Sequence, residues 1–181
     1  MALISSPYNV IQAVRGTNTT FLTEQHVPSV NLKGKWIVIT GSNNGVGFEA
    51  AKTFAKWGAN LILACREPPA WELHPTAAMK ECKDLAEAKD HESTIEWWKI
   101  DMADFESVEA FAQRWLDTGR PLDILCNNAG VAATARPTEK PRLTKDGFQI
   151  VHQVSSLFPR WIKHQLKFLI SSRSTCYLMY Y

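Results

Sequence analysis

Three glycines near position 40 have a spacing that suits phosphate binding. Gly41, Gly45 and Gly47 directly follow the apolar run 36–40, and a helix-like segment, 46–57, begins among them. Glycines let a backbone approach a pyrophosphate closely, and the start of a helix offers N–H groups and the positive end of its dipole. The spacing therefore predicts a turn that binds a dinucleotide, and with it redox chemistry.

A second polar motif follows a later apolar run. Residues 122–126 have the composition of a buried strand, and Asn127-Asn128-Ala129-Gly130 comes directly after them. In open parallel sheets, ligands bind outside the carboxyl ends of the strands, at the point where the strand order reverses. We expect the two motifs to meet at that edge.

The segments between these motifs alternate between strand-like and helix-like patterns. Strands are expected at 36–40, 60–66, 94–100 and 122–126, and helices at 46–57, 76–88 and 107–117. Such alternation predicts a parallel sheet with right-handed crossovers and helices on both faces. The expected fold is a Rossmann-type, doubly wound α/β sheet with strand order 3-2-1-4.

Composition excludes several kinds of function. The chain has 181 residues and a net charge of only +2, so we expect no nucleic-acid partner. No apolar run is long enough to span a bilayer, and the N-terminus does not resemble a secretory signal, so a cytoplasmic location is expected. The cysteines and histidines are scattered, which argues against a metal site.

Taken together, the two motifs resemble those of the short-chain dehydrogenase/reductase family. The pattern Thr40-Gly-x3-Gly-x-Gly47 and the Asn127–Gly130 motif carry the resemblance. Ala64-Cys-Arg66 and Leu143–Phe148 are most similar to its retinol-dehydrogenase-like members. The expected division of the chain is an irregular N-terminal extension, an NADP-binding Rossmann domain and a tail unlike the family, over residues 1–32, 33–154 and 155–181.

The resemblance implies a set of cofactor-binding residues. Along the glycine turn they are Gly41, Ser42, Asn44, Gly45, Val46 and Gly47, and after the fourth strand they are Asn128, Ala129 and Gly130. The first group would line the phosphates and ribose, and Asn128 and Ala129 would hold the adenosine ribose side and brace the turn after the fourth strand. Asp101 and Met102 would flank the adenine, whose amino group would donate to the Asp101 carboxylate or to the adjacent backbone. The side chain of Asn127 is expected to bond to the backbone.

Arg66 bears on the choice between NADP and NAD. An NAD enzyme needs a carboxylate near the end of the second strand to accept from the ribose 2′-hydroxyl. Here no acid appears until Glu67. A guanidinium suits a 2′-phosphate because its fork donates two charge-assisted hydrogen bonds. We therefore favour NADP over NAD, with an ordinary solvated loop arginine as the alternative for Arg66.

The sequence lacks the pattern of catalytic residues that the family uses. The family's chemistry uses a tyrosine as general acid–base and a lysine in the pattern Tyr-x3-Lys. None of the four tyrosines has a lysine at that spacing, and Ser155 stands where the family has an asparagine. We assign no catalytic residue and expect negligible dehydrogenase activity from the chain as it stands.

The family pattern ends near Val154. Pro159 would break or restart the long helix expected there, and Ser171 and Ser172 only imitate the strand that should carry a catalytic serine. A truncated gene model, a retained intron, a frameshift or an alternative splice form would each produce such a tail. The sheet would be incomplete on its C-terminal side, with an apolar edge on the fourth strand. Candidates to cover that edge are Trp161, Leu166, Phe168, Leu169 and Ile170.

Three functions stay open at this point. The chain is an NADP-dependent oxidoreductase acting on a carbonyl or alcohol, a catalytically silent NADP-binding module, or a non-functional fragment. The partners considered are a small-molecule substrate if the chain is active, a second copy of the chain, and a complete homologue.

Overall fold

The computed structural model describes residues 29–70, 72–132, 141–158, 162, 164 and 166, and the backbone of 175–177. The chain divides into two compact units, Met1–Val30 and Asn31–Tyr181. Every helix and strand that the structure describes belongs to the second unit.

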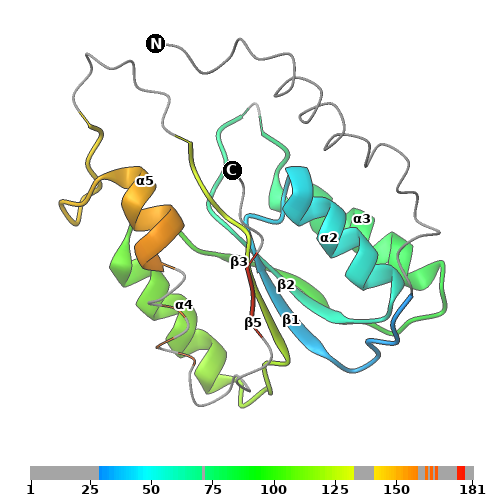
Figure 1. The fold of residues 1–181 in the computed structure, drawn as a ribbon. Coiled ribbons are helices and arrows are strands. Elements are labelled where there is room, and N and C mark those ends of the chain that lie inside the picture. The colour runs from blue at the N-terminus through cyan, green and yellow to red at the C-terminus, as the bar shows by residue number, and fades with distance from the viewer. Residues whose placement is uncertain are drawn as a thin grey trace, which may run out of the picture. The chain divides into compact units, whose positions relative to one another are not determined.

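Five parallel strands form one sheet in the order β3-β2-β1-β4-β5 (Figure 1). Their bounds are β1 (Trp36–Thr40), β2 (Asn60–Cys65), β3 (Ile95–Lys99), β4 (Ile124–Asn127) and β5 (Thr175–Tyr177). In the register, Val38 pairs with Ile62 of β2 and with Leu125 of β4. The predicted order 3-2-1-4 is confirmed, and β5 extends it by one strand.

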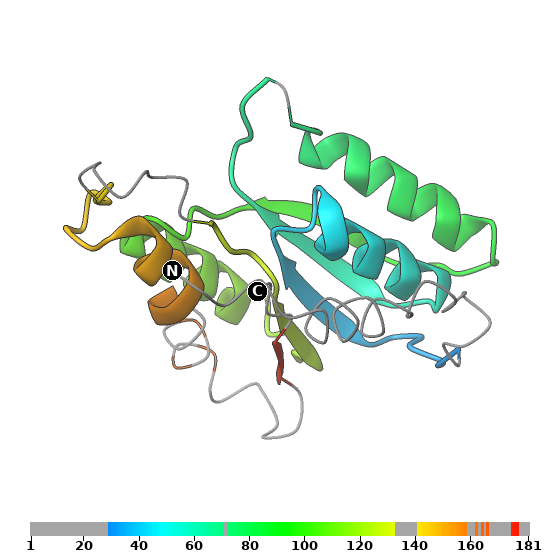
Figure 2. The same cartoon turned by 45° about the horizontal axis from the view of Figure 1, so that its top comes forward.

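Helices cover both faces of this sheet (Figures 1 and 2). On one side lie α2 (Gly45–Lys56) and α3 (Pro75–Glu87), and on the other lie α4 (Phe105–Asp117), α5 (Ile150–His152) and a π-helical turn, η3 (Gln153–Leu157). Because successive strand residues point to opposite faces, Ile37 and Ile39 join the α2–α3 core whereas Val38 joins the α4 core. The predicted doubly wound α/β fold is confirmed.

Short polar caps set the helix ends. Asp104 caps α4 by accepting from Glu106 N and Ser107 N at 2.9 and 3.3 Å, so α4 begins two residues before the expected Ser107. Pro75 occupies the first position of α3, where its missing N–H costs nothing. Gly58, with φ of +84°, follows the end of α2, where a left-handed glycine commonly ends a helix.

The edge of β4, which was expected to be open, is paired with a short C-terminal strand. That edge is paired with β5, through Leu125–Thr175 and Cys126–Cys176 among others, so β4 does not present an open edge. Phe158, Ile162 and Leu166 recur every four residues and are fully buried in the α4 core, so Leu166 packs against one face of the sheet, and β5 pairs with the edge it was expected to cover. The other residues expected to cover the edge, together with Pro159, Ser171 and Ser172, lie outside the described part.

Within the described residues, no helix is long and apolar enough to cross a membrane. The same residues contain no group of three or more His, Cys, Asp or Glu side chains that could hold a metal ion.

Candidate cofactor-binding site

The glycine turn joins the end of β1 to the start of α2. Gly41 and Gly45 have φ of +64° and +55°, in the left-handed region that favours glycine. Asn44 is the N-cap of α2 but makes no side-chain capping bond, and the backbone bond from Phe48 N to Asn44 O measures 3.2 Å. The first N–H groups of a helix have no partner within the helix, and its dipole is positive at this end. The turn can therefore receive an anionic group.

Gly47 lies where the helix packs most closely on the strand ends. A Cβ atom at this position would be 2.3 Å from Asn128 Nδ2 and 2.5 Å from Gly41 O. A Cβ on Gly41 would be 2.9 Å from the Cα atom of Ala129. The glycine turn and the motif after β4 are therefore in contact, as the predicted topological switch point requires.

Thr40 and Asn128 hold these two motifs together. Thr40 Oγ1 donates to Cys126 O at 3.3 Å and accepts from Asn128 N and Ala129 N, both at 3.0 Å. Asn128 Nδ2 donates to Thr40 O and Gly41 O at 2.9 and 3.0 Å. Thr40 belongs to the glycine motif but was not among the predicted cofactor-binding residues, although a hydroxyl at the end of an apolar strand is a signal for such a role.

The backbone hydrogen bonds expected of Asn127 are made by its neighbour Asn128. Asn127 was predicted to bond to the backbone, yet its buried Nδ2 and Oδ1 have no partner among the described residues, and Asn128 makes the backbone bonds instead. Side chains alternate between the two sides of a strand, and only Asn128 points toward the glycine turn. Asn128 Oδ1 is likewise buried without a described partner.

Ser42 and Asn43 direct their side chains into the protein. Ser42 Oγ donates to Ile39 O at 3.0 Å and lies 3.5 Å from Cys65 Sγ, and burial raises the pKa of the Cys65 thiol. Asn43 Nδ2 donates to Leu73 O at 2.9 Å, which ties the loop after β2 to the turn. Any contact between Ser42 and a phosphate would therefore use its backbone.

Arg66 lies directly after β2, beside the turn. The carbonyl of Ala64 accepts from Gly41 N at 2.8 Å, which brings the ends of β1 and β2 together. Arg66 Nη2 donates to Glu72 Oε1 at 2.8 Å. Sequence reasoning missed Glu72, because its approach to Arg66 depends on the path of the loop between them.

Residues after β3 and within η3 lie next to the same end of the sheet. Asp101 Oδ1 accepts from Ala103 N at 2.8 Å, and the carbonyl of the buried Met102 accepts from Gln153 Nε2 at 3.5 Å. Ser155 Oγ accepts from Val131 N at 3.5 Å, just beyond Gly130. The π-helical turn thus places Ser155 against the loop that follows β4.

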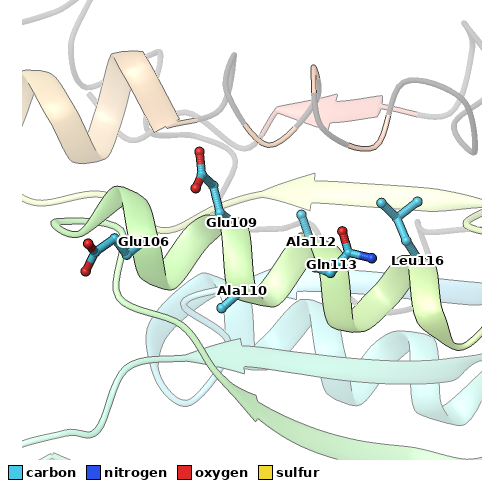
Figure 3. A pocket seen from close by; sticks show the side chains of 6 residues that line it. All are labelled: Glu106, Glu109, Ala110, Ala112, Gln113 and Leu116. Carbon is cyan, nitrogen blue, oxygen red and sulfur yellow. The ribbon is translucent and has the colours of Figure 1, made fainter.

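A hollow of about 410 Å³ lies elsewhere, along α4 (Figure 3). Its lining residues all come from that helix: Glu106, Glu109, Ala110, Ala112, Gln113 and Leu116. None of them belongs to the predicted cofactor-binding set, so the hollow is separate from the site described above.

Comparisons with known proteins agree with this geometry. The family described as short chain dehydrogenase matches residues 35–157. Retinol dehydrogenase 12 of Mus musculus is 37% identical over 129 residues, which is 71% of this chain and 37% of that protein. The WW domain-containing oxidoreductase of Homo sapiens is 38% identical over 124 residues, covering 68% of this chain and 27% of that protein.

Solved structures share the fold. A blue fluorescent protein from a metagenomic library, solved in complex with NADPH, matches with a TM-score of 0.61 and 20% identity, over 82% of this chain and 56% of that chain. The matched part of this chain spans between 27% and 40% of the length of such curated relatives, from the human WW domain-containing oxidoreductase to retinol dehydrogenase 11 of Mus musculus. With the family matched over most of its length, the chain belongs to the short-chain dehydrogenase family.

Proposed function

We propose that this chain holds NADP at the glycine turn and that the protein is an oxidoreductase acting on a carbonyl or alcohol. One observation carries the proposal. Two left-handed glycines lead into α2, and Gly47 and Asn128 pack too closely for any side chain at position 47. This arrangement leaves bare backbone at the positive end of a helix, which is what a pyrophosphate requires.

The described residues fit such a cofactor. The backbone of 41–47 would receive the pyrophosphate, and Arg66 would donate to the 2′-phosphate. Asp101 and Met102 would flank the adenine, and Asn128, Ala129 and Gly130 would bound the ribose side, where buried Asn128 Oδ1 has no described partner. When bound, the nicotinamide would supply or accept the hydride.

The second candidate function is a catalytically silent NADP-binding module, alone or paired with a complete homologue. The observation that favours it is the absence of Tyr-x3-Lys from the 181 residues, together with Ser155 in the position of the family's asparagine. Without a general acid–base beside the cofactor, hydride transfer loses about 10²- to 10⁴-fold in rate from that source alone. We therefore expect binding with negligible turnover from this chain.

Thermal unfolding of the purified 181-residue chain tests both candidates. At a hundredfold excess over Kd, NADP should stabilise the chain by about 2.7 kcal/mol, or roughly 5–10 °C in Tm, and NAD by less. Arg66→Leu should remove most of the difference between the two cofactors. The absence of any shift with either cofactor would overturn the binding proposal, and the absence of a cooperative melt would favour a fragment without function. Steady NADPH oxidation with a panel of carbonyl compounds would overturn the silent module.

A further inference from the structure

Arg66, the residue proposed to receive the 2′-phosphate, already has an anionic partner. Its Nη2 lies 2.8 Å from Glu72 Oε1. The Arg66 side chain is 56% exposed, whereas that of Glu72 is only 24% exposed, so the carboxylate is the more enclosed member of the pair. A phosphate that binds Arg66 would have to share the guanidinium with this carboxylate or displace it.

The loop that carries Glu72 is held in place on both sides. Leu73 O accepts from Asn43 Nδ2 of the glycine turn at 2.9 Å, and Glu72 N donates to Pro69 O at 3.0 Å. Pro68 and Pro69 restrict the backbone further, because proline locks φ. A restrained loop backbone reduces the entropy that is lost when Glu72 pairs with Arg66, which favours the pair.

The other acid of the loop has different partners. Glu67 Oε1 lies 3.3 Å from His74 Nε2, and Glu67 Oε2 lies 3.7 Å from Lys99 Nζ. Among the described residues, Glu72 is therefore the carboxylate that faces Arg66.

We propose that Glu72 competes with the 2′-phosphate for Arg66 and thereby sets how strongly the chain prefers NADP to NAD. The inference rests on the proposed cofactor function. NADP must exchange the carboxylate for its phosphate, and the displaced Glu72 then stands beside a dianion, which repels it. NAD has no 2′-phosphate, so its binding leaves the pair between Arg66 and Glu72 intact.

Glu72→Gln separates these contributions, because it removes the charge and keeps the shape. We expect NADP to bind about three- to tenfold more tightly to Glu72→Gln than to the wild type, and NAD to change by less than about twofold. Dissociation constants would be measured by isothermal titration calorimetry at low salt, with the Tm of each variant as a check of folding. Glu67→Gln is the matched control, since it makes the same charge change in the same loop without touching Arg66.

A double-mutant cycle with Arg66→Leu locates the effect. In the Arg66→Leu background, Glu72→Gln should tighten NADP by less than about twofold, because no guanidinium is left to release. If the wild type binds NADP but Glu72→Gln binds it no better, the cofactor proposal stands and the competition is refuted. If Glu72→Gln bound NADP more weakly than the wild type, Glu72 would be a positioning residue for Arg66. If Glu67→Gln tightened NADP as much as Glu72→Gln does, the effect would come from net charge. If no variant binds either cofactor, both proposals fall.

Discussion

Thr40 shows how one hydroxyl can organise a site. Its Oγ1 joins the carbonyl of Cys126 to the N–H groups of Asn128 and Ala129, and all of these groups lie between β1 and β4. Asn128 N has a second acceptor in Cys126 O at 3.1 Å, but Ala129 N depends on Thr40. The hydroxyl therefore sets the direction of the chain as it leaves β4.

Thr40→Val keeps the volume of the side chain but removes these bonds. We expect the free energy of unfolding to fall by about 2 kcal/mol, because the half-buried Ala129 N–H loses its acceptor and the buried Cys126 carbonyl loses one of its donors. Urea denaturation followed by tryptophan fluorescence would measure the change. Thr53→Val is the matched control: Thr53 Oγ1 donates to Glu49 O on an exposed part of α2, and its loss should cost less than about 1 kcal/mol. Equal effects of the two variants would contradict the organising role of Thr40.

At the scale of elements, the loop before α5 docks on the N-terminus of α4. Lys145 Nζ lies 2.7 Å from Asp104 Oδ1 and 2.8 Å from Glu106 Oε2. The hydrogen bond from Lys145 holds the pKa of Asp104 below its ordinary value, and Asp104 with Glu106 raises the pKa of Lys145. Asp104 thus serves both as the cap of α4 and as the anchor of the loop.

The lowered pKa of Asp104 predicts a loss of stability in acid. A carboxylate whose pKa is depressed by folding stabilises the native state above its unfolded pKa, near 3.9, and this stabilisation is lost as the pH falls through the folded pKa. Asp104→Asn keeps a good N-cap but abolishes the charge, so its unfolding free energy should depend less on pH below about 4 than that of the wild type. Chemical denaturation at a series of pH values would measure this.

Asp117→Asn provides the comparison at the other end of α4. Asp117 accepts a hydrogen bond from Gln113, and the change removes the same charge without touching the loop. If Asp104→Asn retained the full acid dependence of the wild type, the assigned anchor would be wrong.

At the scale of the whole molecule, Gln153 connects η3 to the segment that follows β3. It is fully buried, and its Nε2 donates to Asp146 Oδ2 at 2.8 Å and to Met102 O at 3.5 Å. Its Oε1 accepts from Thr144 Oγ1 at 2.5 Å, and Asp146 Oδ2 also accepts from Phe105 N at 3.0 Å. The start of η3, the loop before α5 and the end of β3 are therefore joined through one amide.

Gln153→Leu should destabilise the protein by about 2–3 kcal/mol, because Met102 O, Asp146 and Thr144 each lose a hydrogen-bond partner around a fully buried position. Calorimetric or denaturant unfolding would give the value. Gln113→Leu makes the same substitution on the exposed face of α4 and should cost less than about 1 kcal/mol. If Gln153→Leu were as stable as the wild type, apolar packing alone would hold η3 against the segment after β3.

Much of the fold could be predicted because it follows from local patterns. Continuous apolar runs indicated the four strands to within about two residues, and their alternation with helices is what parallel sheets require. The glycine spacing likewise placed the turn between β1 and α2. The pairing of β5 with β4 could not be foreseen, because a three-residue strand has too little pattern of its own and is defined by its partner.

The sequence by itself determined the sheet order, the glycine turn and the meeting of that turn with the motif after β4, because each depends on residue type and period. Tertiary structure alone decided that the Asn127 side chain does not make the expected backbone bonds among the described residues, and that Thr40 supports the turn. It also decided that Arg66 faces Glu72, six positions along the chain. These contacts depend on how two strands pack, on the path of a loop or on the direction of a side chain, and such information appears only once the strands and loops are packed.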